Sequence, residues 1–461
     1  MANKPSIPKG TRDFSPEEML RREFIFDTIK SVFKLYGYQP IETPAIENLS
    51  TLLGKYGEEG DRLIFKILNS GDFLSDVDSD DLIARNTAKL SGLICEKGLR
   101  YDLTVPFARY VVQHRDKILF PFKRYQIQPV WRADRPQKGR YREFFQCDVD
   151  VIGSDSLLNE YELVRIIDEI FTKLKINVVT KINNRKLLAG IAEYVDEENR
   201  IIDITVAIDK LEKIGADAVN KELIEKGVSS KAVAKLQPLL KLEGSAAFKF
   251  EKLAELLSHS VTGMKGIVEL RELFSYFDTG LLKASPELDL TLARGLNYYT
   301  GTIIEVKAAD VNIGSICGGG RYDNLTGVFG LAGISGVGIS FGADRIYDVM
   351  THLDLFDSRE TSLSKVLVLN FGNSAFEYAF KILSLLRSLD IRSEFYPDPV
   401  KIKKQITYAN GRKIPYILMA GDDEIKADIV TVRNMTSGQQ QKVPFGNLKE
   451  YLILEISKDS L

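Results

Sequence analysis

The chain has 461 residues, of which 44% are hydrophobic and 27% are charged, and its formal net charge is −2. This length exceeds what one hydrophobic core usually serves, so two or three domains are expected. The balanced charge excludes a protein that is basic throughout, but it leaves room for a local nucleic-acid surface. The sequence starts without a long apolar run and contains none elsewhere, so neither a signal peptide nor a membrane span is expected.

Three cysteines (Cys95, Cys147 and Cys317) and three histidines are scattered along the chain. This spacing makes neither a disulfide framework nor a metal cluster, and it fits the reducing cytoplasm. No histidine is near a cysteine or another histidine in the sequence. A histidine-based metal site and a Ser-His-Asp triad are therefore not expected.

The first elements, in chain order, are an amphipathic helix at residues 16–36, ended by Gly37, and strand-like segments up to residue 151. The acidic, Ser-rich stretch at residues 70–86 is typical of a solvated loop. A helix is expected at residues 157–175. The composition then changes to Lys- and Glu-rich helices, at residues 203–215, 230–243, 249–260 and 266–277, which indicate a helical insertion.

Strand patterns return at residues 301–309 and 335–350, and a polar linker follows at 354–364. The remaining residues alternate between short apolar strands and amphipathic helices. Such alternation predicts a small α/β domain with a mostly parallel sheet.

The stretch "WRADRPQKGRYREFFQCDVDV" predicts a β-hairpin, because "RPQKGR" has Pro early and Gly late between two strand-like flanks. Alternation places a graded set of side chains on one strand face, from cations through an aromatic ring and an amide to carboxylates. A ligand with phosphates, a purine and an ammonium group would match this gradient, and Arg132 on the facing strand adds a cation. The alternative is an exposed ribbon with ordinary surface charge. The graded face comprises Arg140, Arg142, Phe144, Gln146, Asp148 and Asp150.

The stretch "LRYDLTVPFARYVV" alternates as well, with Arg100, Asp102 and Thr104 on one predicted strand face and a helix from Pro106 onward. Asp102 and Thr104 are suited to an ammonium group. The alternative is an edge strand with a solvated aspartate.

The stretch "LARGLNYYTGTIIEV" sets Arg294 beside a glycine, which lets the backbone approach a ligand. The hydroxyl groups of Tyr298 and Tyr299 could hydrogen-bond a polar side chain, although a tyrosine pair is also common in core packing.

Two glycine runs follow, "CGGGRYDNL" and "GISGVGISFGADRI". Glycines clear space where a flat ligand meets a sheet, and Arg345 would lie near the start of the next helix, where it could meet a terminal phosphate. Neither run matches the P-loop or the dinucleotide-binding pattern. Bulges and turns are the alternative explanation.

Together these segments resemble the class II aminoacyl-tRNA synthetases, and specifically the histidyl-tRNA synthetase family. "KGTRDFSP" and "YGYQPIETPAIE" resemble the family's entry sequence and first motif, with Pro44 at the motif's proline. The hairpin resembles the second motif and "GVGISFGADRI" the third. The most specific matches are the two histidine signatures, "LARGLNYYTG" and "CGGGRYDNL".

The resemblance implies an α+β catalytic domain built on an antiparallel sheet, with a helical insertion and a C-terminal α/β anticodon-binding domain. The expected ranges are 1–180 and 284–353 for the two parts of the catalytic domain, 181–283 for the insertion, 354–364 for the linker, and 365–461 for the anticodon-binding domain.

The resemblance also implies site residues. Arg132 and Arg294 would be the catalytic arginines at the α-phosphate. ATP would be held by Arg132, Arg140, Phe144 and Arg345, with the ring of Phe144 stacked on adenine. Histidine would be held by Asp102, Leu103, Thr104, Arg132, Gln146, Asp150, Arg294, Tyr298 and Tyr299.

Three positions depart from the family pattern: Asn297 where Asp is usual, Asp134 where Glu is usual, and Phe145 where His or Tyr is usual. No role is assigned to them.

The implied reaction joins L-histidine to AMP from ATP, with Mg²⁺ neutralising the triphosphate, and then transfers histidine to tRNA(His). The histidine carboxylate is already a nucleophile at neutral pH, so alignment and positive charge matter more than a general base. The resemblance also implies a cytoplasmic homodimer with no membrane partner. The alternative is a non-catalytic relative that senses histidine or tRNA, or a regulatory subunit.

Overall fold

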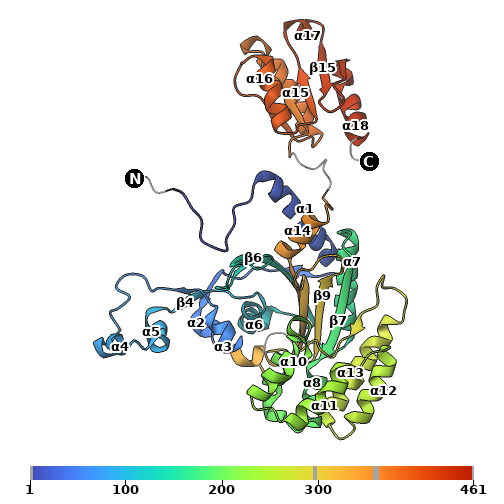
Figure 1. The fold of residues 1–461 in the computed structure, drawn as a ribbon. Coiled ribbons are helices and arrows are strands. Elements are labelled where there is room, and N and C mark those ends of the chain that lie inside the picture. Colours follow the sequence, from blue (N-terminus) through green and yellow to red (C-terminus); the bar gives the residue numbers. More distant parts are fainter. Residues whose placement is uncertain (1–3, 294–297, 357–362, 459–461) are drawn as a thin grey trace. The chain divides into compact units, whose positions relative to one another are not determined.

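The structure is a computed structural model that describes residues 4–293, 298–356 and 363–458 (Figure 1). The chain divides into two compact units. The first comprises Met1–Asp13 and Arg22–Leu355, and the second comprises Phe14–Arg21 and Phe356–Leu461. None of the helices in the described part of the chain is long and apolar enough to cross a membrane.

An eight-stranded sheet forms the centre of the first unit, in the order β1-β5-β6-β11-β10-β9-β7-β8. The six inner strands pair antiparallel with their neighbours, and the short outer strands β1 and β8 pair parallel. The expected antiparallel catalytic sheet is therefore confirmed. The strands are β1 (Gln39–Pro40), β5 (Phe122–Trp131), β6 (Glu143–Ile152), β7 (Val178–Asn184), β8 (Glu287–Leu288), β9 (Thr302–Ala308), β10 (Cys317–Tyr322) and β11 (Gly336–Gly342).

The register of β6 against β11 sets Asp148 opposite Ser340 and Asp150 opposite Gly338. A Cβ atom on Gly338 would lie 1.9 Å from Oδ1 of Asp150, so only glycine leaves room for this carboxylate. Gln146, Asp148 and Asp150 are only 8%, 2% and 2% exposed. The exposed-ribbon alternative is therefore wrong for this half of the hairpin.

Helices α1 (Pro16–Leu35) and α7 (Leu158–Lys173) cover the opposite face of the sheet. Phe33 of α1 and Phe171 of α7 both contact the ring of Phe341 in β11. The apolar residues of α1 recur at helical spacing, and the helix stops before Gly37, whose φ is +78°. The predicted first helix is thus confirmed.

Helix α6 (Thr104–Gln113) covers the polar face, where the guanidinium carbon of Arg124 lies 4.1 Å from the ring centre of Phe107. The predicted strand through residues 100–104 is wrong, because β4 (Lys97–Leu99) has already ended and α6 begins at Thr104. Oδ1 of Asp102 accepts a hydrogen bond from the N–H of Val105, which favours the helical turn. Pro106 lies inside the first turn, where a missing N–H costs nothing.

The chain segment that precedes α6 forms a three-stranded sheet in the order β2-β4-β3, with β2 at Ile46–Asn48 and β3 at Lys66–Ile67. The stretch expected to be a solvated loop contains a short helix, α4, whose first turn is capped by the side chain of Asp78. The helices of this region are α2 (Leu49–Leu52), α3 (Gly57–Arg62), α4 (Ser79–Ala84) and α5 (Thr87–Ile94).

Six helices follow β7 and gather beside it, green to yellow in Figure 1. The residue expected to begin the insertion, Lys181, lies inside β7 opposite Glu305, and the first helix starts at Arg185. The single helix expected at 203–215 is two helices, and Gly215 has a non-helical φ of +80°. The helices are α8 (Arg185–Tyr194), α9 (Ile201–Ile208), α10 (Leu211–Glu225), α11 (Ser230–Leu240), α12 (Ala246–Leu256) and α13 (Val261–Phe277). Helix α14 (Ala343–His352) continues directly from β11.

The second unit has a five-stranded sheet in the order β13-β12-β14-β15-β16. The first two pairings are parallel and the last two antiparallel, so the expectation of a mostly parallel sheet is wrong. The connections after β14 are too short for the crossover that parallel strands need. The elements are β12 (Val366–Val368), α15 (Phe376–Ser388), β13 (Ser393–Phe395), α16 (Ile402–Gly411), β14 (Tyr416–Met419), α17 (Asp422–Lys426), β15 (Ile429–Asn434), β16 (Gln440–Pro444) and α18 (Leu448–Lys458).

Candidate active site

A cavity of about 250 Å³ opens on the polar face of the large sheet. Its walls come from the α6 start, the β5–β6 hairpin, the segment before β9 and the β11–α14 junction. The structure therefore brings together stretches that the sequence analysis treated separately. The predicted residues that line the cavity are Asp102, Thr104, Arg132, Arg140, Phe144, Gln146, Tyr298, Tyr299 and Arg345.

Two other predicted residues, Leu103 and Asp150, are not among the described residues that line this cavity. Leu103 is fully buried in the apolar core. Asp150 lies deeper than Gln146 along β6, where it pairs with Arg124. Arg294 lies outside the described residues, as does Asn297.

Asp102 is the centre of a buried hydrogen-bonded group at one end of the cavity. Its Oδ1 accepts from the hydroxyl of Tyr56 at 3.0 Å, and its Oδ2 accepts from the hydroxyl of Tyr298 at 3.1 Å. Burial raises the pKa of Asp102, and the N–H of Val105 and the charge of Arg132 oppose that rise. Sequence reasoning missed Tyr56, because no local pattern relates it to Asp102.

Arg132 lies between two aromatic rings on the cavity wall. Its guanidinium carbon is 4.2 Å from the ring centre of Tyr101 and 5.2 Å from that of Phe144. Nε donates to the carbonyl of Tyr101 at 3.1 Å. This contact fixes the plane of the guanidinium, whose other N–H groups are suited to a carboxylate or a phosphate.

Two further arginines lie where the hairpin loop meets α14. Nε of Arg140 is 2.8 Å from Oδ2 of Asp134. Arg345 donates to the carbonyls of Gly139 at 2.7 Å and Ser315 at 2.6 Å. These contacts hold the glycine of the hairpin loop against the start of α14.

Asp344 connects the hairpin to the start of α14 at the arginine end of the cavity. It was not predicted from the sequence. Its carboxylate pairs with Arg12 and, at 2.5 Å, with Arg22, and it accepts from the N–H of Phe145 at 2.8 Å. The guanidinium of Arg12 also stacks on the ring of Tyr141, 3.5 Å from its centre. Phe145, to which no role was assigned, thus contributes through its backbone.

The floor of the cavity is the β6 face. Nε2 of Gln146 donates to Ser340 at 2.6 Å, and Oε1 of Gln146 is buried with no hydrogen-bond partner among the described residues. Further along, Arg124 is 2.8 Å from Asp150 and 4.0 Å from Asp148. One buried arginine therefore faces two buried carboxylates.

Burial raises the pKa of both carboxylates. It raises the pKa of Asp148 to about 7, against the opposing charge of Arg124, and the negative Asp150 adds to that rise. Burial also raises the pKa of Asp150, against Arg124 and a 2.7 Å hydrogen bond from the hydroxyl of Tyr322. Tyr322 and Arg124 were both missed. Tyr322 lies two positions after the last glycine of the glycine run, and this closeness was the available signal.

The site combines cations at one end of the cavity with a buried carboxylate and tyrosines at the other, on an antiparallel sheet. Residues 365–455 of the other unit match a sequence family described as "Anticodon binding domain". A site of this kind joined to an anticodon-binding domain defines an aminoacyl-tRNA synthetase. Residues 10–90 and 95–346 match the family described as "Histidyl-tRNA synthetase". The chain belongs to the histidyl-tRNA synthetase family.

Individual relatives agree with this assignment. A protein named histidine–tRNA ligase from Bacteroides fragilis (strain YCH46) is 61% identical over 96% of this chain and 98% of its own length. One from Porphyromonas gingivalis is 57% identical over 96% of this chain and 97% of its own. The crystal structure of histidyl-tRNA synthetase from Nostoc sp. PCC 7120 has a TM-score of 0.82 and 30% identity, covering 98% of this chain and 100% of that one.

Proposed function

We propose that this chain is a histidine–tRNA ligase that joins L-histidine to AMP from ATP and then transfers histidine to tRNA(His). Membership of the family supports this activity. The observation that carries it in the structure is Arg132, which lies between the Asp102 end of the cavity and the ring of Phe144. A cation at this point is suited to align a carboxylate with an α-phosphate.

We assign the Asp102 end of the cavity to histidine. Asp102, Thr104 and Gln146 would take up the α-ammonium group. Oε1 of Gln146 supports this role, because it is buried and has no hydrogen-bond partner among the described residues. Tyr298 and Tyr299 would face the imidazole. Asp150, which lies beneath the cavity floor and pairs with Arg124, would act on the histidine site without lining it. A pocket that hydrogen-bonds a polar side chain rejects apolar analogues strongly. Leu103 would contribute through its backbone alone, because its side chain is in the core.

We assign the other end to ATP. The ring of Phe144 would stack on adenine, Arg132 would contact the α-phosphate, and Arg140 and Arg345 would lie along the outer phosphates. Their positions on the hairpin loop and at the start of α14 support this assignment. Arg294, outside the described residues, would add the second cation at the α-phosphate.

Mg²⁺ is proposed to enter with the triphosphate as part of the substrate. The described residues contain no group of three or more His, Cys, Asp or Glu side chains that could hold a metal ion. The carboxylates of Asp134 and Asp344, which line the cavity, already face Arg140 and Arg12. Neither of these two carboxylates is therefore assigned to Mg²⁺.

The second unit is proposed to bind the anticodon region of tRNA(His). Helix α16 exposes Lys403 and Lys404, and Arg412 follows it. A cluster of cations on one short helix is suited to phosphate contacts. A homodimer in the cytoplasm is a further proposal. Membership of the histidyl-tRNA synthetase family supports it.

The test is histidine-dependent exchange of labelled pyrophosphate into ATP, followed by charging of tRNA(His). The Arg132→Ala variant should lose exchange by roughly a hundredfold or more. Arg115→Ala, which changes an arginine that is 57% exposed, is the matched control and should exchange normally. A folded wild-type chain that binds histidine but shows no exchange would instead support the sensor or regulatory alternative.

A further inference from the structure

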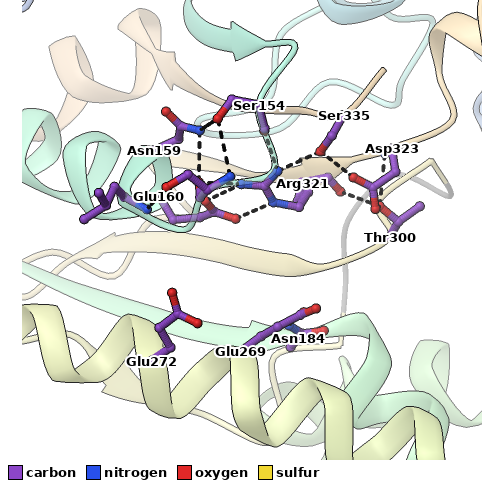
Figure 2. Close-up of polar contacts among 12 residues, drawn as sticks. Ser154, Asn159, Glu160, Asn184, Glu269, Glu272, Thr300, Arg321, Asp323 and Ser335 are labelled. Carbon is purple, nitrogen blue, oxygen red and sulfur yellow. Dashed lines mark hydrogen bonds and ion pairs between the residues drawn. The ribbon is translucent and has the colours of Figure 1, made fainter. Parts of the chain in front are cut away.

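Thr300 joins the tyrosine pair of the cavity to strand β10, and its contacts are shown in Figure 2. Its Oγ1 donates to Oδ2 of Asp323 at 2.6 Å and accepts from the N–H of Asp323 at 3.1 Å. Its N–H donates to the carbonyl of Arg321 at 2.8 Å. Both the backbone and the side chain of Thr300 are thus held by the segment that follows the glycine run.

Asp323 is held on its other side as well. Its Oδ1 accepts from the hydroxyl of Ser335 at 2.6 Å, and the same hydroxyl accepts from Nη1 of Arg321 at 2.7 Å. Both carboxylate oxygens of Asp323 are therefore engaged, one by Thr300 and one by Ser335 (Figure 2). The carboxylate has little freedom to rotate away from Thr300.

Arg321 connects this group to helix α7. Its Nε and Nη2 reach the two carboxylate oxygens of Glu160 at 2.6 and 2.5 Å, and further N–H groups donate to the carbonyls of Ser154 and Ser156. Arg321 is 5% exposed and Glu160 is fully buried. A paired ion contact in a buried place fixes direction as well as distance. We call Thr300, Asp323, Arg321 and Glu160 the β10 clamp.

The tyrosine pair directly precedes the β10 clamp. The ring centres of Tyr298 and Tyr299 are 4.9 Å apart with an angle of 65° between the ring planes, and the hydroxyl of Tyr298 donates to Asp102. Tyr299 lies against β10, because a Cβ atom on Gly320 would be 3.1 Å from its ring. One peptide bond separates this pair from Thr300, so a shift of Thr300 would move both rings.

We infer that the β10 clamp is a positioning device for histidine recognition, which sets the affinity for histidine by fixing where Tyr298 and Tyr299 enter the cavity. This inference rests on the proposed histidine end of the site. None of the four clamp residues lines the cavity, so they act through the tyrosines and are positioning residues. The inference predicts a selective effect: histidine binding should depend on the clamp, and ATP binding should not.

The test compares Thr300→Val, which keeps the shape and removes the hydroxyl, with Thr300→Ser, which keeps the hydroxyl. Thr407→Val is the matched control, because Thr407 also donates one hydrogen bond but is exposed on α16. In pyrophosphate exchange, the KM for histidine should rise about tenfold in Thr300→Val, which is typical for a lost hydrogen bond to a charged group. The KM for ATP should stay unchanged, and Thr300→Ser should restore most of the histidine affinity.

Asp323→Asn provides a second variant that breaks the same contact, in case Thr300→Val folds poorly. Equal changes in both KM values, or a lowered Tm with an unchanged KM for histidine, would show that the clamp is only structural. Calorimetric histidine binding is measured on the same samples. If the wild-type chain binds histidine without any exchange, the proposed activity fails, and the histidine Kd of Thr300→Val still decides the role of the clamp.

Discussion

The hydroxyl of Tyr298 donates a 3.1 Å hydrogen bond to Oδ2 of Asp102, although 196 positions separate the two residues in the chain. Tyr56 reaches the other oxygen of the same carboxylate from a third segment. The carboxylate thus orients the tyrosine ring before any ligand binds, and Asp102 is expected to act on the affinity for histidine both directly and through Tyr298.

Asp102→Asn should weaken histidine binding about tenfold or more, because it removes a buried charge that the α-ammonium group would pair with. Isothermal calorimetry with L-histidine measures the effect. Asp116→Asn, which changes a side chain that is 93% exposed, is the control and should bind normally. An unchanged Kd in the Asp102 variant would remove this residue from the histidine site.

Phe144→Ala should raise the KM for ATP while leaving the histidine Kd close to the wild-type value. Stacking of a base on an aromatic ring contributes about 1–3 kcal/mol, which corresponds to roughly a 5- to 150-fold rise. Phe144→Tyr keeps a flat ring and should behave like the wild-type chain. A larger effect of Phe144→Ala on histidine than on ATP would reverse the two ends assigned to the cavity.

Gly338→Ala should destabilise the first unit, because the added Cβ would lie 1.9 Å from Oδ1 of Asp150 and 2.3 Å from its Cγ. Gly338 and Asp150 lie on neighbouring strands of the sheet and cannot move apart easily. The free energy of unfolding should therefore fall by about 1–3 kcal/mol or more. Urea denaturation measures it. Gly92→Ala is the control, because a Cβ there meets nothing within 4 Å. Equal stability of the two variants would mean that Asp150 can move aside freely.

Asp148→Asn should stabilise the chain at pH 8 relative to the wild type. Burial raises the pKa of Asp148 in the folded chain to about 7, above its ordinary value of 3.8, so the folded state holds this proton more tightly than the unfolded state. The contribution of Asp148 to stability therefore falls as the pH rises from about 4 to 7. The asparagine of the variant does not ionise, so the variant does not lose this stability as the pH rises. It also leaves Arg124 paired with Asp150 alone.

The measurement for Asp148 is the difference in free energy of unfolding between the variant and the wild type across pH. The difference should be small near pH 4, grow up to about pH 7 and then stay level. A difference that does not change with pH would show that Asp148 is ionised in the folded chain throughout this range.

Features that depend on neighbouring residues were predictable from the sequence. The first helix and its end at Gly37, the β5–β6 hairpin, and the passage from β11 into α14 were all confirmed. Helical and strand periodicity, a proline and a few glycines carry this information over short distances. The resemblance of several motifs in order also indicated the family, and the family was confirmed.

Other features were decided by tertiary structure alone. The sequence could not relate Tyr56 to Asp102, Arg124 to Asp150, or Thr300 to Asp323, because each contact depends on the order and register of strands that are distant in the chain. It also predicted a strand at residues 100–104, where a side-chain hydrogen bond to Val105 favours a helix start. Local patterns determine which elements form. The polar contacts within a buried site follow from how those elements pack, since each carboxylate removed from water must find its partners there.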